Sequence, residues 1–457
     1  MVSSLISVSL ALVLGPAAAL VDARRDCERL RGDAGLAACT QAIRENPQDG
    51  SAYNLRGLRY YARGDLDSAL ADYTKRVELE PKNPEAYDRR GLLYQAKALR
   101  EIGADQPTLA ATMAAAKHLE RALADHDRAI ELDPKYAPAY INRADVYRKS
   151  GDRDRALADY GKAIELAPNY AFAYGHRGFF LQEVGDVDRA LADYNTAIRL
   201  NPHYAAAYGA RADVLFRKGD LDRALADHSK VIAIEPNDAA AYRKRGVIHR
   251  LKGDLGRMLA DFDKAVVFDP KYSDGYYYRG FVHLAQGDLA RAIADYDRAI
   301  ELRPIYFNAF FERGVANLYS GSAPKALADL RQAHELHAVQ PYTALWLDIV
   351  SKRANLASPL AQAIENVDMT QWPAPVVRMF LGELTAEAVL AAANHPQAQV
   401  RSEQVCEANF YIGALALQQR RKDEAIRRFR AAAGGCNKGL IEAAAANAEL
   451  RALGVAR

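Results

Sequence analysis

Eight arginines recur along the sequence, each directly before a small residue, and each is followed by an aspartate. Arg56 lies eight residues before Gly64, and Asp72 lies eight residues after it. In an antiparallel pair of helices that turns at Gly64, both side chains would lie about 12 Å from the turn, at ~1.5 Å per residue. A guanidinium and a carboxylate placed side by side form a two-point ion pair. The eight pairs are Arg56 with Asp72, Arg90 with Asp125, Arg143 with Asp159, Arg177 with Asp193, Arg211 with Asp227, Arg245 with Asp261, Arg279 with Asp295 and Arg313 with Asp329.

We interpret these pairs as a structural ladder, formed within repeat units or between neighbouring units. A partly buried guanidinium needs its carboxylate, because stranding either charge costs about 3–5 kcal/mol. Regular pairing would fix how the helices are aligned and stacked. The alternative is that the eight arginines bind a ligand, and the regularity of the pairing favours the structural interpretation.

A second group of residues combines aromatic rings with cations and predicts recognition of a partner. These residues occupy first-helix positions that face away from the packing side of three successive repeat units. Aromatic anchors beside cations are typical of a peptide-binding groove. The alternative, that the aromatic rings pack against the C-terminal helices, stays open. The candidate residues are Arg243, Lys244, Arg250, Tyr277, Tyr278, Phe281, Phe311 and Tyr319, with Asp274 and Asn308 beside them.

Catalytic chemistry is not indicated. The sequence contains no P-loop, GxSxG, HExxH or catalytic Cys-His signature. His334 and His337 lie three residues apart on one predicted helix, without a clear third ligand, so we predict no metal site. His126 and His228 hold the aromatic position of predicted second helices, where core packing is the better interpretation. We therefore expect a protein that is not an enzyme and needs no cofactor.

The cysteines and the N-terminus together predict export. Leu5 to Leu14 is an apolar run of signal-peptide length, and small residues follow it. We predict a signal peptide in residues 1–23, with cleavage after Ala19 or Ala23. An even number of cysteines in an exported chain favours disulfides over free thiols. The chain would be periplasmic or otherwise exported and soluble. The predicted bonds are the two local ones, Cys27–Cys39 and Cys406–Cys436.

Other membrane and nucleic-acid roles are not predicted. Arg24, Arg25 and Asp26 precede Cys27, whereas a lipid-modified cysteine needs small and apolar residues there. No later segment is long and apolar enough to cross a membrane. The formal net charge of +3 comes from 61 basic and 58 acidic residues, so no surplus of cations marks a nucleic-acid surface.

Repeated helical hairpins are the elements that must position these groups. The arginine and its small neighbour recur every 34 residues, apart from one step of 53 between Arg90 and Arg143. Within a unit, apolar residues follow helical spacing, Gly219 can end the first helix, and Asp220 can cap the second. A proline such as Pro236 closes most units, because it cannot continue a helix.

This pattern resembles the tetratricopeptide repeat (TPR) superfamily. The resemblance covers residues 50–338 in eight units, with a partial unit at 24–49. It implies an all-α fold, a right-handed superhelical solenoid of hairpins whose concave face binds proteins or peptides. The common TPR pattern carries leucine where this sequence has arginine.

One unit carries 19 extra residues, as an insertion at about 95–114. We expect both helices of this unit to be longer by about two and a half turns, around a turn at Asp105-Gln106-Pro107. This projection is either a docking site for a partner or extra helix length that the fold tolerates without a binding role. The apolar residues expected to join its two helices are Leu99, Ile102, Leu109 and Met113.

Residues 339–457 are predicted to form a helical C-terminal region, with one more TPR-like unit at about 406–437 and a closing helix that caps the solenoid. Gln371-Trp372, Leu381-Gly382 and Asn409-Phe410-Tyr411 resemble the C-terminal half of NlpI-type bacterial periplasmic TPR lipoproteins. That resemblance implies an adaptor that brings a periplasmic protease to cell-wall hydrolases. The alternatives are an assembly factor for envelope or surface polymers, and a regulatory subunit of an enzyme complex.

Overall fold

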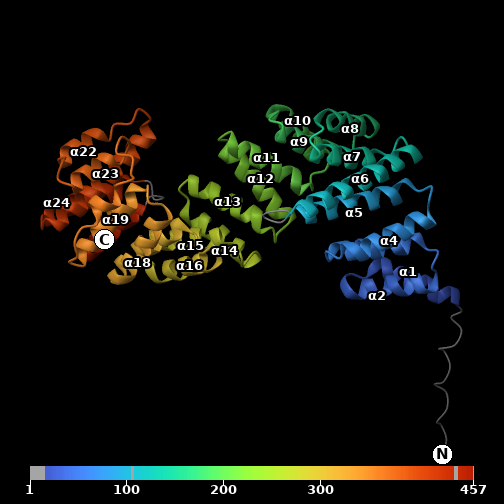
Figure 1. The fold of residues 1–457 in the computed structure, drawn as a ribbon, viewed down its shortest axis with the longest axis horizontal. Coiled ribbons are helices and arrows are strands. Elements are labelled where there is room, and N and C mark those ends of the chain that lie inside the picture. Colours follow the sequence, from blue (N-terminus) through green and yellow to red (C-terminus); the bar gives the residue numbers. More distant parts are fainter. Residues whose placement is uncertain (1–15, 104–107, 437–440, 456–457) are drawn as a thin grey trace, which may run out of the picture. The chain divides into compact units, whose positions relative to one another are not determined.

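The structure, a computed structural model, describes residues 16–103, 108–436 and 441–455 as helices and short connections, and these residues contain no strand. The chain divides into two compact units, Met1–Val214 and Leu215–Arg457. The first unit contains α1 (Pro16–Arg29), α2 (Gly32–Glu45), α3 (Gly50–Ala62), α4 (Leu66–Leu79), α5 (Pro84–Ile102), α6 (Leu109–Leu132), α7 (Ala137–Lys149), α8 (Arg153–Leu166), α9 (Ala171–Glu183) and α10 (Val187–Leu200) (Figure 1).

Helix α11 (Ala205–Arg217) contains the boundary between the units. The second unit continues the hairpins and then adds shorter helices. It contains α12 (Leu221–Ile234), α13 (Ala239–Leu251), α14 (Leu255–Phe268), α15 (Ser273–Gln286), α16 (Leu289–Leu302), α17 (Phe307–Tyr319), α18 (Ala323–Leu336), α19 (Pro341–Arg353), α20 (Leu360–Ala363), α21 (Ala374–Phe380), α22 (Ala386–Ala392), α23 (Ala398–Gln418), α24 (Lys422–Gly435) and α25 (Ile441–Ala452).

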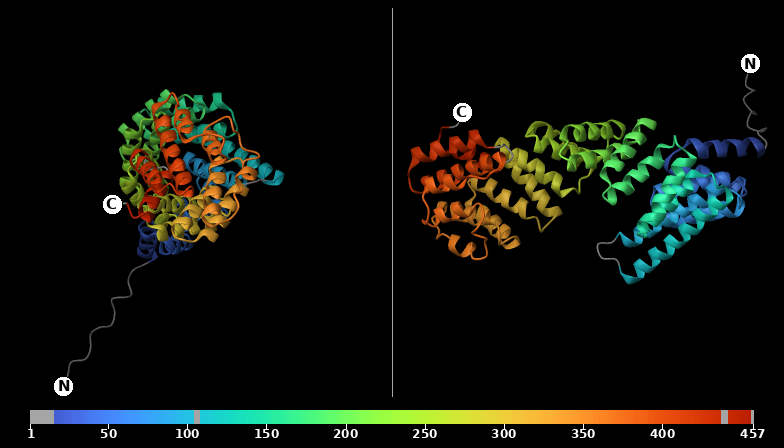
Figure 2. Two further views of the ribbon diagram at one scale, coloured as in Figure 1. Left: turned by 90° about the vertical axis from the view of Figure 1, so that its left-hand side faces the viewer. Right: turned by 90° about the horizontal axis from the view of Figure 1, so that it is seen from above.

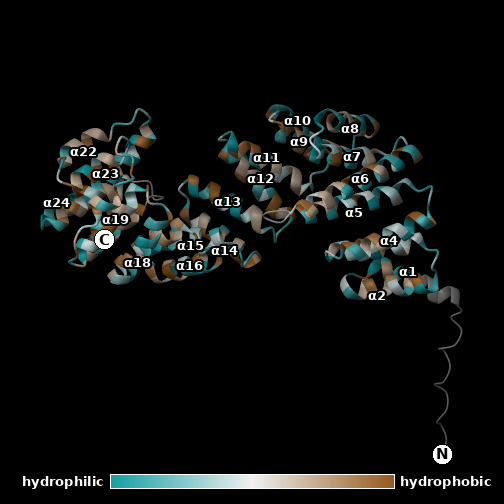
Figure 3. Cartoon of the chain, viewed as in Figure 1, coloured by the Kyte–Doolittle hydropathy of each residue, from teal (hydrophilic) through white to brown (hydrophobic). Residues whose placement is uncertain are grey.

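The hairpins form where the sequence predicts them. Gly219 has a positive φ of 80°, which glycine adopts without strain, and Asp220 then accepts a hydrogen bond from the backbone N–H of Arg223 at 3.2 Å. Most helices carry hydrophobic and hydrophilic residues on different faces (Figure 3). The apolar faces meet inside each hairpin and between neighbouring hairpins of one unit. The all-helical repeat architecture is therefore confirmed.

Small residues let the two helices of a hairpin approach closely. A Cβ atom added to Gly178 on α9 would lie 2.7 Å from a ring carbon of Tyr194 on α10. Tyr194 is fully buried. The small residue after the arginine therefore leaves room for a side chain of the second helix, a ring in Gly178's hairpin and Leu330 in that of Gly314.

The long hairpin of α5 and α6 differs from the prediction in two respects. Helix α5 has 19 residues and α6 has 24, compared with 13 and 14 in the next hairpin, so the extra length is unequal. The far ends project beyond neighbouring helices of the first unit (Figure 2). The predicted turn at 105–107 lies outside the described residues. The expected apolar zipper is wrong, because its residues are 43–78% exposed: Leu99, Ile102, Leu109 and Met113.

The closing helix does more than cap the end of the second unit. Helix α25 packs on α24 and α23, and it also contacts α15 and α17, the first helices of the seventh and eighth repeats. Most of the predicted leader lies outside the described residues, and α1 begins at Pro16. Among the described helices, none has the length and apolar character needed to span a bilayer.

Candidate partner-binding site

The arginine–aspartate pairs lie inside single hairpins. In each pair whose bonds are described, Nε and Nη2 of the arginine donate to the two oxygens of the aspartate on the second helix; for Arg177 and Asp193 the distances are 2.7 and 2.8 Å. The aspartates are buried. The pairs with this geometry are Arg56 with Asp72, Arg90 with Asp125, Arg143 with Asp159, Arg177 with Asp193, Arg245 with Asp261, Arg279 with Asp295 and Arg313 with Asp329.

The same arginines also connect neighbouring hairpins. Nη1 of Arg143 donates to Asp127 of the preceding second helix at 2.7 Å, and Arg313 donates to Asp297 at 2.6 Å. Arg211 makes the equivalent bond to Asn195 at 2.6 Å, and Asp227 is buried like the other aspartates. Each arginine of the ladder also lies over the aromatic ring three residues before it, at 5.3–5.9 Å.

The hydrogen bonds of the ladder pair the positive charges of its arginines with the negative charges of its aspartates. For Arg56, the hydrogen bond to Asp72 raises the guanidinium pKa, although burial opposes that shift. The guanidinium groups use their donors on carboxylates, hydroxyls and amides of their own and the preceding hairpin. This arrangement favours the structural role for the ladder, because little of the guanidinium is left for an outside ligand.

Disulfides join two local pairs of helices. Cys27 and Cys39 connect α1 to α2 with their Cα atoms 4.5 Å apart. Cys406 on α23 bonds to Cys436, directly after α24, with a Cα–Cα distance of 5.3 Å. Both bonds therefore lie within a hairpin of antiparallel helices.

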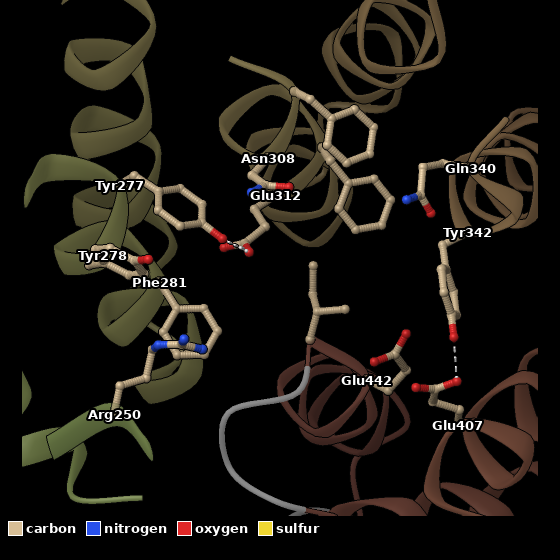
Figure 4. Close-up of a pocket in the computed structure, with 13 residues that line it drawn as sticks. Arg250, Tyr277, Tyr278, Phe281, Asn308, Glu312, Gln340, Tyr342, Glu407 and Glu442 are labelled. Carbon is tan, nitrogen blue, oxygen red and sulfur yellow. Dashed lines mark hydrogen bonds between the residues drawn. The ribbon is translucent and has the colours of Figure 1, made fainter. Parts of the chain in front are cut away.

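A cavity of about 340 Å³ lies in the second unit, between first helices of the repeats and the C-terminal helices (Figure 4). Helices α13, α15 and α17 supply one side, and α19, α23 and α25 supply the other. Aromatic rings and carboxylates dominate the wall. The lining residues are Arg250, Tyr277, Tyr278, Phe281, Phe307, Asn308, Phe311, Glu312, Gln340, Tyr342, Glu407, Ile441 and Glu442.

Five of the eight residues predicted for partner binding line this cavity: Arg250, Tyr277, Tyr278, Phe281 and Phe311. The cavity also includes Asn308, which the sequence places beside them. The first helices of three successive repeats therefore bring most of the predicted group to one place.

Arg243, Lys244 and Tyr319 do not line the cavity. The guanidinium of Arg243 lies 5.0 Å from the ring centroid of Tyr272, and Lys244 is half-buried. Tyr319 donates a hydrogen bond to Glu449 of α25 at 2.8 Å, so this ring packs against a C-terminal helix. The packing interpretation therefore holds for Tyr319, and partner binding by the residues of the cavity stays a prediction.

Three glutamates in the cavity wall accept hydrogen bonds mainly from aromatic residues. Glu312 of α17 accepts from the phenols of Tyr277 at 2.7 Å and Tyr296 at 2.6 Å. Glu407 of α23 accepts from Tyr342 and from the indole N–H of Trp372, each at 2.7 Å. Glu442 of α25 accepts from Tyr411 at 3.2 Å. Figure 4 shows Glu407 and Glu442 together on one side and Glu312 on the other.

Burial raises the pKa of all three glutamates. The pKa of Glu312 rises to about 7, even though the hydrogen bonds from Tyr296 and Tyr277 act in the opposite direction. The pKa of Glu442 rises to about 8, because burial and the charge of Glu407 both disfavour its ionised form. Burial also raises the pKa of Glu407. In the described part of the chain, none of the three forms a salt bridge.

Arg250 is the one cation among the described residues of the cavity wall. Its guanidinium lies 5.6 Å from the ring centroid of Tyr278, and its positive charge lowers the pKa of Glu312. The buried Nε atom of Arg250 has no hydrogen-bond partner within the described ranges. Arg250 therefore offers a donor that these residues do not use.

Sequence reasoning missed the three glutamates. Glu312 lies between Phe311, which was predicted to bind a partner, and Arg313, which was predicted to belong to the ladder. Glu442 and Glu449 lie seven residues apart among alanines, on one face of α25. Two carboxylates on the apolar face of an alanine-rich helix are a signal of buried charge, and that signal was available.

A smaller cavity of about 210 Å³ lies in the first unit, lined in part by Asp88, Tyr136, Asn142 and His176. Asp88 accepts hydrogen bonds from Asn142 at 3.0 Å and contacts Nδ1 of His126 at 2.8 Å. The carboxylate of this cavity therefore has partners within the chain.

The other histidines have structural surroundings. Nδ1 of His334 lies 3.4 Å from the hydroxyl of Thr343, and the ring of His337 contacts that of Phe307. His126 is fully buried between Asp88 and Gln95. Within the described residues, no group of three or more histidine, cysteine, aspartate or glutamate side chains has an arrangement suited to a metal ion.

Comparison with solved structures finds TPR proteins. YrrB, a TPR protein with an unusual peptide-binding site, is 23% identical over 40% of this chain and 95% of its own length. A thermophilic TPR protein of Thermus thermophilus is 25% identical over 44% of this chain and 99% of its own. PilF of Pseudomonas aeruginosa is 15% identical over 49% and 95%. The TM-score is 0.38 in all three cases. No curated protein matches this chain by sequence.

Sequence models of repeat families match the hairpins directly. A model described as a TPR repeat matches residues 57–97, and models described as tetratricopeptide repeats match 137–170, 181–234 and 273–306. These matches fall on successive helical hairpins of the structure. The matched segments of this chain are therefore tetratricopeptide repeats.

Proposed function

We propose that this chain is a protein-interaction scaffold that binds a segment of a partner protein at the cavity of the second unit. The observation that carries the proposal is the cavity itself, which the first helices of two successive repeats, α15 and α17, line with aromatic rings. Buried aromatic anchors and a small number of polar groups are typical of surfaces that bind polypeptides. TPR hairpins commonly present such surfaces on their first helices.

Site-specific photo-crosslinking tests this proposal. A photoreactive amino acid at Asn308, which lines the cavity, should crosslink the partner in cells that make the full chain. The same amino acid at Val267, which is 67% exposed on α14 and lies outside the cavity, is the matched control. Equal crosslinking from both positions, or none from Asn308, would reject the cavity as the binding site.

We further propose an adaptor role in the bacterial cell envelope. Two disulfides and the apolar run before Pro16 support export, because such bonds persist in oxidising compartments. The resemblance of the C-terminal region to NlpI-type proteins supports a link between a periplasmic protease and cell-wall hydrolases. An assembly factor for surface polymers is the second candidate.

Fractionation of cells that make the full-length chain tests the location. The expected result is a periplasmic or secreted chain whose thiols are unreactive until a reductant is added. Retention in the cytoplasm with four reactive thiols would overturn the envelope role and leave the scaffold proposal to the crosslinking experiment.

A further inference from the structure

Among the described residues, no cation forms a salt bridge with the three carboxylates in the wall of the cavity, although buried carboxylates normally require one. Glu312 and Glu442 are 8% and 4% exposed, and Glu407 is half-buried. Their described side-chain partners are phenols and one indole, which donate hydrogen bonds but carry no positive charge. Uncompensated buried charge is costly, and proteins usually pair it or neutralise it.

Glu442 has an oxygen that no side chain of the described residues satisfies. Tyr411 donates to Oε1 of Glu442, the backbone N–H of Glu442 also donates to this carboxylate, and no second side chain from the described ranges does so. Figure 4 shows this carboxylate directed toward the space between α17, α19 and α23. An almost fully buried carboxylate that faces a cavity with unused acceptor capacity points to a ligand that donates.

From this geometry we infer that the cavity receives a cationic side chain, lysine or arginine, from the partner segment whose binding is proposed above. Glu442 and Glu407 would bind the charged end on one side, and Glu312 would face it from the other. The inference rests on the proposed scaffold function and adds the chemistry of the group that is recognised.

The aromatic wall fits the same ligand. Rings from α15, α17 and α19 surround the cavity, and aromatic faces attract ammonium and guanidinium groups by about 0.5–2 kcal/mol each. The methylene stem of a lysine or arginine would pack on these rings. The cavity, at about 340 Å³, has room for such a side chain. The rings are Tyr277, Tyr278, Phe281, Phe307, Phe311 and Tyr342.

Arg250 sets the orientation of the ligand. Its guanidinium carries a positive charge, which repels a cation. The charged tip of the bound side chain would therefore lie toward Glu407 and Glu442.

Binding of a cation here should depend on pH. The titratable groups that influence Glu442 are Glu312 and Tyr319 of α17, Tyr342 of α19, and Glu407 and Tyr411 of α23. The pKa values of Glu312 and Glu442 are raised to about 7 and 8, whereas lysine stays protonated up to about pH 10. Affinity should therefore rise between about pH 6 and 8.5, as the glutamates lose their protons and the ligand keeps its charge.

Calorimetric titration of the full chain with blocked tripeptides tests the inference. The probes are glycyl-lysyl-glycine, glycyl-arginyl-glycine and glycyl-norleucyl-glycine, of which the last resembles the lysyl peptide in length but lacks its charge. At pH 8.5 we expect the lysyl or arginyl peptide to bind at least tenfold more tightly than the norleucyl peptide. At pH 6 this preference should fall at least fivefold. Equal binding of all three would overturn the inference.

Variants of the full chain identify the group responsible. Glu442→Gln keeps the shape of the side chain and removes its charge, so it should reduce binding of the cationic peptide at least fivefold, and Glu312→Gln should act in the same direction. Glu301→Gln is the control, since Glu301 is exposed on α16 and pairs with Arg298. Unchanged affinity in the well-folded Glu442→Gln variant would overturn the inference.

The crosslinking experiment separates this inference from the function on which it rests. A crosslink from Asn308 that persists in Glu442→Gln, with no competition by the lysyl peptide, would reject the cationic ligand and leave the scaffold function in place. Binding of the lysyl peptide without any crosslink from Asn308 would instead reject the scaffold function at this site.

Discussion

Buried carboxylates occur in two settings in this chain, and their partners differ. In the ladder, aspartates accept two hydrogen bonds from a guanidinium of their own hairpin, as Asp193 does from Arg177. In the cavity, Glu312, Glu407 and Glu442 accept from phenols and an indole. The first arrangement neutralises its own charge and the second does not. In the described part of the chain, paired charges thus build the repeats, and the carboxylates with no paired cation are those for which we propose a ligand.

The two cavities repeat this contrast. In the first unit, Asp88 is surrounded by Asn142 and His126, both within hydrogen-bond distance. In the second unit, Tyr411 is the one side chain of the described residues that donates to Glu442. Both cavities are lined by first helices of repeats and by aromatic rings, and the second adds three carboxyl groups that form no salt bridge within the described residues.

The largest effect should come from breaking a ladder pair. Asp193→Ala leaves the guanidinium of Arg177 partly buried without its carboxylate, so we expect a loss of about 3 kcal/mol in the free energy of unfolding. Urea unfolding followed by circular dichroism measures it. The control is Arg189→Ala, which removes an exposed pair with Asp186 and should cost less than about 1 kcal/mol.

A double-mutant cycle shows whether the lost stability comes from the interaction between Arg177 and Asp193. Combining Asp193→Ala with Arg177→Met should cost less than the sum of the two single changes, by at least about 1 kcal/mol. Strict additivity would mean that the two side chains contribute independently, and the ladder would lose its structural role.

Reduction of the disulfides should have the next largest effect. The Cys406–Cys436 bond closes a segment of 30 residues beside Glu407, so its loss should cost about 2–3 kcal/mol. Thermal unfolding with and without reductant measures this cost. Because the bond joins α23 to the end of α24, reduction should weaken cationic-peptide binding at the cavity. Unchanged stability in a Cys406→Ser and Cys436→Ser double variant would contradict the expectation.

The pH dependence of stability should distinguish the cavity from the ladder. Glu312 and Glu442 have raised pKa values in the folded chain, so the folded state holds more protons than the unfolded state above about pH 4.3. Their contribution to stability is full below that pH, declines as pH rises, and levels off once pH has passed the folded values of about 7 and 8. We therefore expect the free energy of unfolding to fall between about pH 5 and 9.

The variants Glu312→Gln and Glu442→Gln check that origin. Glutamine does not titrate, so the double variant should have a flatter pH profile of unfolding over the same range. Glu301→Gln should keep the original profile. A slope that survives in the double variant would mean that other groups titrate.

The smallest effect should come from replacing arginines with lysines in the ladder. Arg143 binds Asp159 and also Asp127 of the preceding hairpin, whereas the residue equivalent to Asp127 beside Arg177 is Gly161. Lysine cannot reach both carboxylates in the same way. We expect Arg143→Lys to cost about 0.5–1 kcal/mol more than Arg177→Lys in urea unfolding. Equal costs would show that the bond between hairpins adds nothing.

The sequence predicts the hairpins well because their signals are local. Gly219 and Asp220 specify a turn and a cap within a few residues, and the period of 34 repeats that information. The partners of the ladder were likewise predictable, since in a regular unit both lie eight residues from one turn. The unequal lengths of α5 and α6 were not, because no local signal shows how 19 extra residues divide between two helices.

Only the aromatic side of the cavity could be predicted from the sequence, because only that side follows from local signals. Its aromatic side belongs to successive repeats, so their phase identified Tyr277, Tyr278, Phe281 and Phe311. Its acidic side comes largely from α23 and α25, and α25 meets α15 and α17 only after the chain has folded back. Nothing in the sequence near Glu442 specifies that contact.

The return of α25 to the first helices also has a consequence for how the chain folds. In a simple solenoid each repeat contacts only its neighbours, so folding can start anywhere and spread. The hydrogen bond from Tyr319 to Glu449 spans 130 residues, and contacts of such long range slow folding because a long loop must close first. The hairpins of the first unit can therefore form independently of the C-terminal helices. The second unit should reach its final cooperative state only after α25 has packed against α15 and α17.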